Sequence, residues 1–175
     1  MLVILYIFLF YRGLGIVSAG SLLVAGAITY TSFLLLGKTI GFTLTLAGIA
    51  GAIVSIGITA DSFIVYFERV RDEVREGRSL RSAVETGWVR ARRTILVADF
   101  VSIIAAVLLY FFAVGGVRGF AFTLGLTTFV DLFVVFFFTK PLVSLLARTS
   151  FYSRGGALSG FSAKSLGIVT GKDVA

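Results

Sequence analysis

The chain has 175 residues, of which 58% are apolar and 14% charged, and its mean hydropathy is +1.02. Soluble domains average roughly 45–50% apolar and about 25% charged residues, so this composition excludes an ordinary soluble globular protein. The chain contains no Cys and no His, which excludes disulfides, thiolate nucleophiles, Ser-His-Asp triads and metal sites built on those residues. We therefore expect neither a metal nor a cofactor.

Five apolar segments have the character of membrane spans, because crossing a hydrocarbon core of roughly 30 Å takes about 20 mostly apolar residues. The first, residues 1–11, is only half that length. It lacks the basic start and cleavage site of a signal peptide, so we interpret it as the end of a longer helix and the chain as part of a larger protein. The other four spans cover about residues 14–36, 41–67, 94–114 and 120–139.

The fold class predicted from these segments is all-α, a polytopic membrane helix bundle over residues 1–148. A long basic loop, residues 68–93, joins the third and fourth spans. Residues 149–175 are rich in Ser and Gly with scattered Lys, which is typical of a flexible tail.

The basic residues predict the orientation of the bundle. Fourteen of the 16 Lys and Arg residues fall on one side of the predicted membrane, and only Lys38 and Arg118 fall on the other. The positive-inside bias makes the richer side cytoplasmic, so the C-terminus is cytoplasmic as well. The net charge of +7 is then explained by orientation and by anionic lipids near the arginine-rich loop, and nucleic acid is not needed as a partner.

The basic loop itself carries a helical pattern. Ser79 is a good N-cap residue, and apolar residues recur after it on one helical face, at Leu80, Ala83, Val84 and Trp88. We interpret this pattern as an amphipathic helix on the cytoplasmic leaflet. The alternative is a solvated loop held by ion pairs between its arginines and its acidic residues.

Three aspartates lie inside predicted spans: Asp61, Asp99 and Asp131. Counted from the nearest basic residue, they lie roughly 12, 9 and 14 Å into the bilayer, which predicts a polar seam at one level. Hydroxyl residues lie close to them in sequence: Thr59, Ser62, Ser102, Thr127 and Thr128. A carboxyl in such surroundings can exchange a proton near neutral pH, and Asp61 is the first candidate. The alternative is that each Asp makes only an interhelical hydrogen bond, worth about 0.6 kcal/mol.

Small residues recur every four positions on the third span, at Ala47, Gly51, Ser55 and Thr59. Such a stripe lets another helix approach closely. Gly57 lies one turn before Asp61 and leaves room for water or for a partner's side chain. Stripes of this kind usually serve packing alone, and the functional alternative is a sliding or rocking contact near Asp61.

Several motifs resemble a known family. The stretches TLTLAGIAG (43–51), IGITADSF (56–63) and FERVRDE (67–73) resemble the fourth transmembrane helix of SecD, in the SecD/SecF family of protein-export membrane proteins. The stretches RTIL (93–96), IIAA (103–106) and RGFAFTL (118–124) are similar to its fifth and sixth helices. The resemblance covers roughly residues 1–147.

This resemblance implies a bacterial cytoplasmic membrane protein of the resistance–nodulation–division type. The resemblance also implies that the protein pairs with a SecF-type subunit and uses proton flow to assist preprotein export through the SecYEG channel, beside the ATPase SecA. The family's essential proton-path aspartate falls on Asp61.

The chain departs from the family pattern at several positions. Ala47 replaces the usual Pro, and Ser62 and Phe63 replace the Ala-Asn that follows the aspartate. In the fifth helix Val97 stands where Asp is expected and Asp99 where Asn is expected. Asp131 matches no motif of the family, so neither Asp99 nor Asp131 receives a role from the resemblance.

Other functions share some of these sequence features. A related proton-driven exporter of lipids or small molecules shares the intramembrane Asp, and a non-conducting structural part of a complex is a further alternative. An intramembrane aspartyl protease using Asp61 and Asp99 is disfavoured, because Ala60 and Ala98 precede them instead of the Tyr and Gly of such proteases. We therefore expect a transport protein rather than an enzyme.

Overall fold

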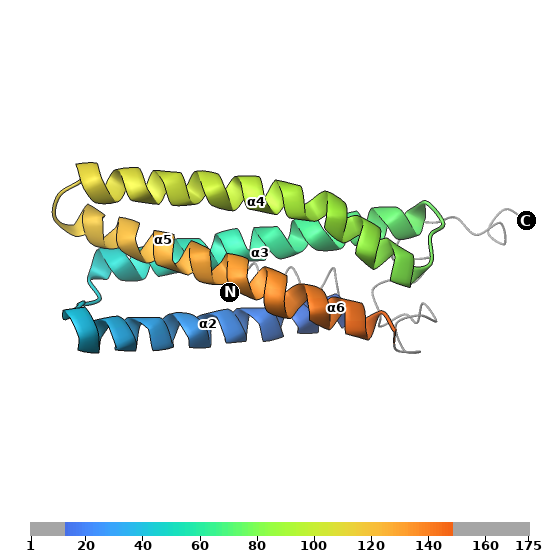
Figure 1. The fold of residues 1–175 in the computed structure, drawn as a ribbon, viewed down its shortest axis with the longest axis horizontal. Coiled ribbons are helices and arrows are strands. Elements are labelled where there is room, and N and C mark those ends of the chain that lie inside the picture. The colour runs from blue at the N-terminus through green and yellow to red at the C-terminus, as the bar shows by residue number, and fades with distance from the viewer. Residues whose placement is uncertain (1–12, 149–175) are drawn as a thin grey trace, which may run out of the picture.

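The structure is a computed structural model that describes residues 13–148. Within this range the chain is all-helical and forms an elongated bundle of roughly parallel rods (Figure 1). The elements in chain order are α2 (Gly13–Ile40), α3 (Leu46–Arg75), α4 (Leu80–Phe112), α5 (Gly116–Val134), the π-helix η1 (Val135–Thr139) and α6 (Lys140–Leu146).

Four rods are long and apolar enough to cross a membrane, since α5, η1 and α6 continue one another over Gly116–Leu146. This confirms the all-α class and the long apolar helices of the bundle. The predicted first span, residues 1–11, and the predicted tail, residues 149–175, lie outside the described residues.

The predicted basic loop is mostly helical. It contains no separate amphipathic helix, because its residues belong to the end of α3 and the start of α4. Helix α3 continues past the predicted end of its span to Arg75, and α4 already begins at Leu80. Ser79 caps α4 as predicted, since its hydroxyl accepts a hydrogen bond from the amide of Ser82. A short turn is all that separates the two long helices.

The apolar face of this segment packs against protein and not against a lipid leaflet. Ala83, Val84 and Trp88 are buried in one core with Tyr66 and Val70 of α3. The physical reason is that the two helical extensions both carry apolar residues on their facing sides. Burying these faces against each other removes both from water, at roughly 25 cal/mol per Å².

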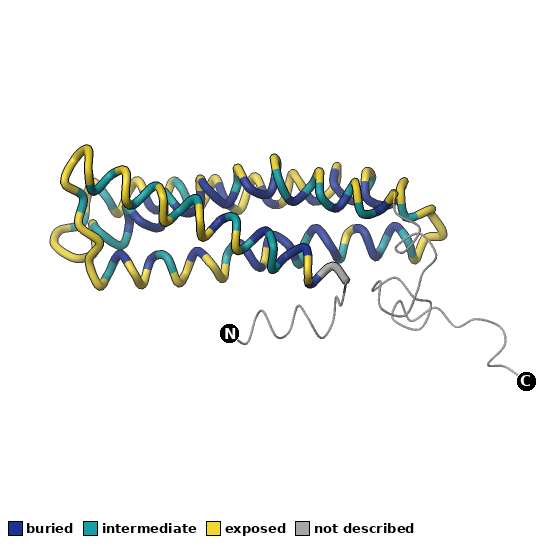
Figure 2. The backbone as a smooth tube through the Cα atoms, turned by 90° about the horizontal axis from the view of Figure 1, so that it is seen from below, coloured by how far each residue is buried: buried dark blue, intermediate teal, exposed yellow. Residues whose placement is uncertain are grey.

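The main core lies at the end of the bundle that carries the α3–α4 turn, here called the basic end because Arg69 to Arg93 surround it. The ring of Trp88 stands edge-on against Tyr66 on one side and Phe136 of η1 on the other, with centroids 5.3 and 4.9 Å apart. Figure 2 shows the buried positions along the inner sides of the rods, with exposed turns at the opposite end. These aromatic contacts tie α3, α4 and η1 together.

A buried acidic residue closes the α3–α4 turn. The carboxylate of Glu73 is fully buried and pairs with Arg78 Nε at 2.9 Å and Arg90 Nη1 at 2.7 Å. Gly77 takes a positive φ of 87° in the turn, a conformation that favours glycine. The two arginine contacts therefore hold the start of α4 against the end of α3.

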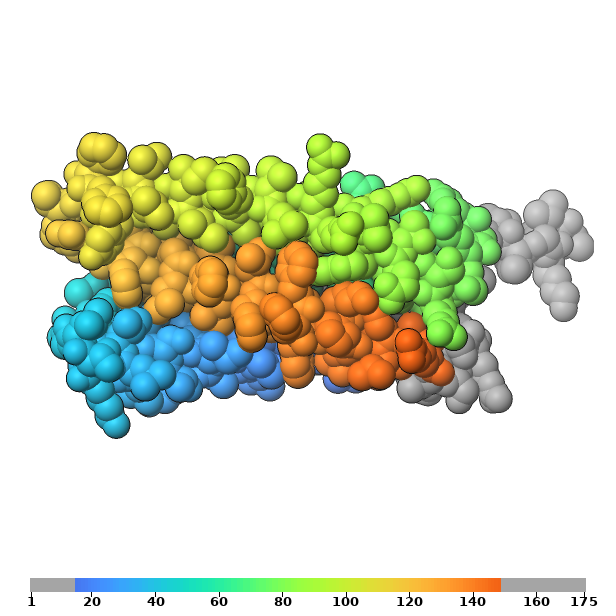
Figure 3. Space-filling model, in the orientation of Figure 1, coloured from blue at the N-terminus to red at the C-terminus, as the bar shows by residue number. Residues whose placement is uncertain are grey.

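The space-filling view shows the rods α4 and α2 flanking the α5–α6 rod on one face (Figure 3). Helix α3 lies behind α5 and approaches it very closely, because a Cβ atom added at Gly51 would lie 2.7 Å from the carbonyl oxygen of Phe120. Helix α2 buries Val17, Ser21 and Ala25 but leaves long stretches of its surface exposed. Close α3–α5 packing fixes where the polar residues of the next section meet.

Candidate functional site

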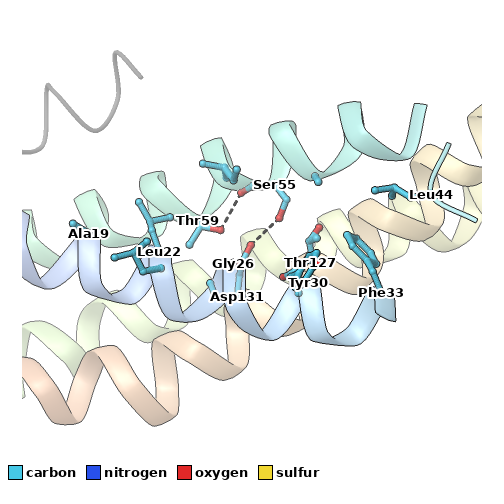
Figure 4. A pocket seen from close by; sticks show the side chains of 15 residues that line it. Ala19, Leu22, Gly26, Tyr30, Phe33, Leu44, Ser55, Thr59, Thr127 and Asp131 are labelled. Carbon is cyan, nitrogen blue, oxygen red and sulfur yellow. Dashed lines mark hydrogen bonds between the residues drawn. The ribbon is translucent and has the colours of Figure 1, made fainter. Parts of the chain in front are cut away.

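Asp131 is the centre of a polar contact between α5 and α3. It is only 7% exposed, and its Oδ2 accepts a hydrogen bond of 2.7 Å from the hydroxyl of Ser55. Thr59, one turn further along α3, donates to the carbonyl oxygen of Ser55 at 3.0 Å (Figure 4). A buried carboxyl needs such partners, because leaving one without hydrogen bonds costs several kcal/mol. The contact joins two helices in the middle of the bundle.

Asp99 brings a second carboxyl to the same place from α4. It is 2% exposed, and it lies close enough to Asp131 for the two groups to interact electrostatically. Among the described residues, the ion pairs involve Glu68, Asp72, Glu73 and Glu85 and not Asp99. The nearby hydroxyl of Ser102 donates to the carbonyl oxygen of Ala98 in its own helix. Two buried carboxyls, one on α4 and one on α5, therefore interact electrostatically inside the bundle.

The predicted hydroxyl residues divide into two groups. Ser55 donates to Asp131, and Thr59 donates to the carbonyl oxygen of Ser55. Thr127 and Thr128 are buried on α5 beside it, but their hydroxyls donate to carbonyl oxygens of their own helix, at Thr123 and Leu124. Ser55, expected only as a small packing residue, is therefore the principal donor to the carboxyl. The sequence signal for this role is that Ser55 and Thr59 both carry hydroxyls and lie four residues apart, on one face of the helix.

Asp61 lies elsewhere. Its side chain is exposed on the surface of α3, whereas Ser55 and Thr59 are buried on the side that faces α5. Gly57, one turn before it, is also exposed, and a Cβ atom there would meet nothing within 4 Å. Ser62, its neighbour in sequence, is buried. The structure thus brings Asp99 and Asp131 together and leaves Asp61 on an open helix face.

The small-residue stripe of α3 faces α5. Besides Gly51, Ala47 lies 3.6 Å from the position of a Cβ atom added at Gly116. A similar close approach exists between α5 and α4, where a Cβ atom at Gly125 would lie 3.3 Å from that of Ala106. These contacts set the short distances across which Ser55 and Asp131 bond.

A π-helix follows the polar contact. Helix α5 ends at Val134, three residues after Asp131, and η1 continues to Thr139. The hydroxyl of Thr139 donates to Ser21 of α2 at 2.8 Å in a buried contact. Single-turn π-segments are frequent at functional sites, and this one turns a polar side chain toward α2.

Comparison with known proteins places these features in a family. Residues 1–149 match the family model "Protein export membrane protein SecD/SecF, C-terminal". The chain is 61% identical over 166 residues to the protein translocase subunit SecD of Streptomyces coelicolor, covering 95% of this chain and 29% of that protein. It is 54% identical over 154 residues to SecD of Mycobacterium tuberculosis, covering 88% of this chain and 27% of that protein.

A solved structure agrees in fold. The crystal structure of SecDF, a translocon-associated membrane protein from Thermus thermophilus, matches with a TM-score of 0.75 and 36% identity, over 83% of this chain and 20% of that one. The chain thus spans less than a third of the length of these relatives. A match over most of its residues, together with the four membrane-spanning helices, shows that the chain belongs to the SecD/SecF family of protein export membrane proteins.

Proposed function

We propose that this chain works in a protein-export complex of the SecD/SecF kind and couples proton movement at Asp61 to preprotein translocation. The relatives it matches are named protein translocase subunits, and the solved relative is named a translocon-associated membrane protein. These names support a transport role and not an enzymatic one. The finer claim, proton coupling, rests on the position of Asp61.

The observation that carries the proposal is that Asp61 is exposed on a membrane-spanning helix. An ionised carboxyl facing hydrocarbon costs at least about 2.5–3.5 kcal/mol, so such a residue faces water or protein, or carries a proton. Gly57 beside it leaves space for an approaching group. A partner subunit of the SecF type, carrying a basic or polar side chain, would cover this face and complete the site.

Proton binding at such a site changes the charge that the partner meets. A neutral Asp61 would release a cationic partner group, and an ionised one would hold it. One proton crossing 100 mV supplies about 2.3 kcal/mol, enough to shift the balance between two docked arrangements by more than tenfold. Helix α3 runs without interruption from this level to the basic end, so a shift of the helix would reach the α3–α4 turn.

The basic end would face the cytoplasm, in agreement with the positive-inside bias. Arg69, Arg81 and Arg93 are exposed there and would contact anionic lipid headgroups. The SecYEG channel, SecA and the preprotein are the further partners that a role in export implies. In this orientation the C-terminus is cytoplasmic and the protein lies in the bacterial cell membrane.

The test is Asp61→Asn in the complete complex, with Asp72→Asn as the charge-matched control. The side chain of Asp72 is 45% exposed at the basic end and pairs with Arg75 at 3.1 Å, away from the membrane-spanning part. Export into inverted membrane vesicles is measured with and without a proton motive force. We expect Asp61→Asn to remove the stimulation by the proton motive force, while Asp72→Asn keeps it and both variants co-purify with the SecF-type subunit.

Export that responds to the proton motive force equally in wild type and Asp61→Asn would exclude the proposed role. Loss of co-purification in Asp61→Asn would instead assign the residue to assembly, which is the structural alternative raised by the sequence.

A further inference from the structure

A cavity of about 570 Å³ lies between α2, α3 and α5 (Figure 4). Most of its wall is apolar, with Leu22 and Gly26 contributed by α2 and Ala52 by α3. Its volume falls in the range of roughly 300–1,000 Å³ that is typical of small-molecule sites. The cavity is therefore large enough for a compact organic molecule of drug-like size.

One wall of this cavity is polar and acidic. Asp131 lines it together with Ser55, Thr59 and Thr127, and Asp99, which is not a lining residue, interacts electrostatically with Asp131. No Lys or Arg is among the side chains of residues 13–148 that line the cavity. Neither Asp99 nor Asp131 takes part in an ion pair within the described residues, so the two carboxyls have no cationic partner there. An uncompensated buried charge is unfavourable, so binding a cation or a proton stabilises carboxyls in this situation.

The cavity opens between α2 and α3. Its rim includes Leu23 and Tyr30 of α2, which are 76% and 65% exposed, and the half-exposed Ile56 of α3. These residues belong to membrane-spanning helices, so a molecule entering here would come from an apolar environment. Phe33 and Tyr30 also present aromatic rings to the cavity, and such rings attract cations that lie over their faces.

We propose that this cavity binds a lipophilic monovalent cation, namely a protonated amine carried on a compact apolar body. The ammonium group donates a hydrogen bond to the carboxylate of Asp131, and the apolar body fills the space between α2 and α3. A bare metal ion would find too few oxygen ligands on the apolar walls, and an anionic or neutral lipid chain would gain nothing from the two carboxyls. This inference does not depend on the proposed role of Asp61 in export.

The experiment measures binding to the 175-residue chain in nanodiscs of zwitterionic phosphatidylcholine. The probe is radiolabelled 3,3-diphenylpropylamine, and empty nanodiscs correct for partition into lipid. The competitors are the unlabelled amine and the neutral 3,3-diphenylpropan-1-ol, which has nearly the same shape. We expect saturable binding that the unlabelled amine displaces and the alcohol does not.

Two variants and one control locate the site. Asp131→Asn keeps the size of the side chain and removes its charge, so we expect amine binding to weaken about 10- to 100-fold, the loss of one charge-assisted hydrogen bond. Gly26→Phe fills the cavity, since a Cβ atom at Gly26 meets nothing within 4 Å, and abolishes binding. Asp72→Asn removes a carboxylate far from the cavity and leaves binding unchanged.

The result that overturns the proposal is equal displacement by the alcohol, or unchanged amine binding in Asp131→Asn. Uptake of the labelled amine by nanodiscs that contain the protein, if no greater than uptake by empty nanodiscs, would overturn the proposal as well. If Asp131→Asn elutes as aggregate in size-exclusion chromatography, Gly26→Phe and the alcohol competition still decide, because neither removes the carboxyl that holds α3 to α5.

Discussion

Two faces of α3 differ in the surroundings that they give to a carboxyl group. On one face, Ser55 donates to the buried Asp131 of α5, and close packing at Gly51 keeps the helices together. On the other face, Asp61 and Gly57 are exposed and touch little. The difference teaches that a carboxyl on an apolar helix can be bonded within its own chain or be left exposed by it. Substitutions on the two faces should therefore have different consequences.

The largest effect is expected for Gly51→Ala. The added Cβ atom would lie 2.7 Å from the carbonyl oxygen of Phe120, which belongs to the backbone and cannot rotate away. Overpacking of this kind costs typically about 1–3 kcal/mol. The matched control is Gly57→Ala, where nothing lies within 4 Å and the better helix propensity of Ala should stabilise the helix slightly.

Unfolding of both variants is followed by the fluorescence of Trp88, the single tryptophan of the chain, which is buried in the core at the basic end. Equal free energies of unfolding for Gly51→Ala and Gly57→Ala would contradict the close α3–α5 contact.

A third carboxyl extends the comparison. Glu73 is fully buried yet bonded to two arginines, whose side chains are 44% and 50% exposed. Glu73→Gln removes the charge that both arginines face, and we expect a loss of about 1–3 kcal/mol, less than for a pair buried on both sides. Glu85→Gln is the control, because Glu85 is 57% exposed in its pair with Lys140 and should cost at most about 0.5 kcal/mol.

The free energies of unfolding of these two variants are compared by the same fluorescence assay, at low and at high salt. Only the exposed Glu85 pair should weaken markedly with salt. A cost for Glu73→Gln as small as that for Glu85→Gln would mean that the arginine contacts do not hold the turn.

Ser55→Ala is expected to have a smaller effect. It removes the 2.7 Å hydrogen bond to a buried carboxyl group, worth about 1–2 kcal/mol. In the double variant with Asp131→Asn, the loss should be less than the sum of the two single losses, because both substitutions break the same contact. Strict additivity in a double-mutant cycle of unfolding free energies would show that the two side chains do not interact.

The smallest effect on stability is expected for Asp61→Asn. Its side chain is exposed on the surface of α3, so replacing it should change the free energy of unfolding of the isolated chain by less than about 0.5 kcal/mol. Thermal unfolding of the purified chain in nanodiscs measures this. A large destabilisation would place Asp61 in the fold of this chain and remove the contrast between the two faces.

The sequence predicted the helical class of the bundle, its long apolar helices and the cap at Ser79, because span length and capping are local properties. The motifs around Asp61 also predicted the family, which the comparisons confirm over most of the chain. The three intramembrane carboxyls were visible from the sequence as well, since charged residues stand out in apolar segments.

The tertiary structure alone decided which of those carboxyls are buried together. Membrane helices are apolar on nearly every side, so the pattern of apolar residues does not tell which face meets another helix. Asp61 and Asp131 lie at similar predicted depths, yet one is exposed and the other is bonded to Ser55. The same limit applies to Trp88, because its spacing fits a lipid-facing helix as well as the core with α3 in which it is buried. Contacts between helices distant in sequence decide these outcomes, and no local spacing encodes them.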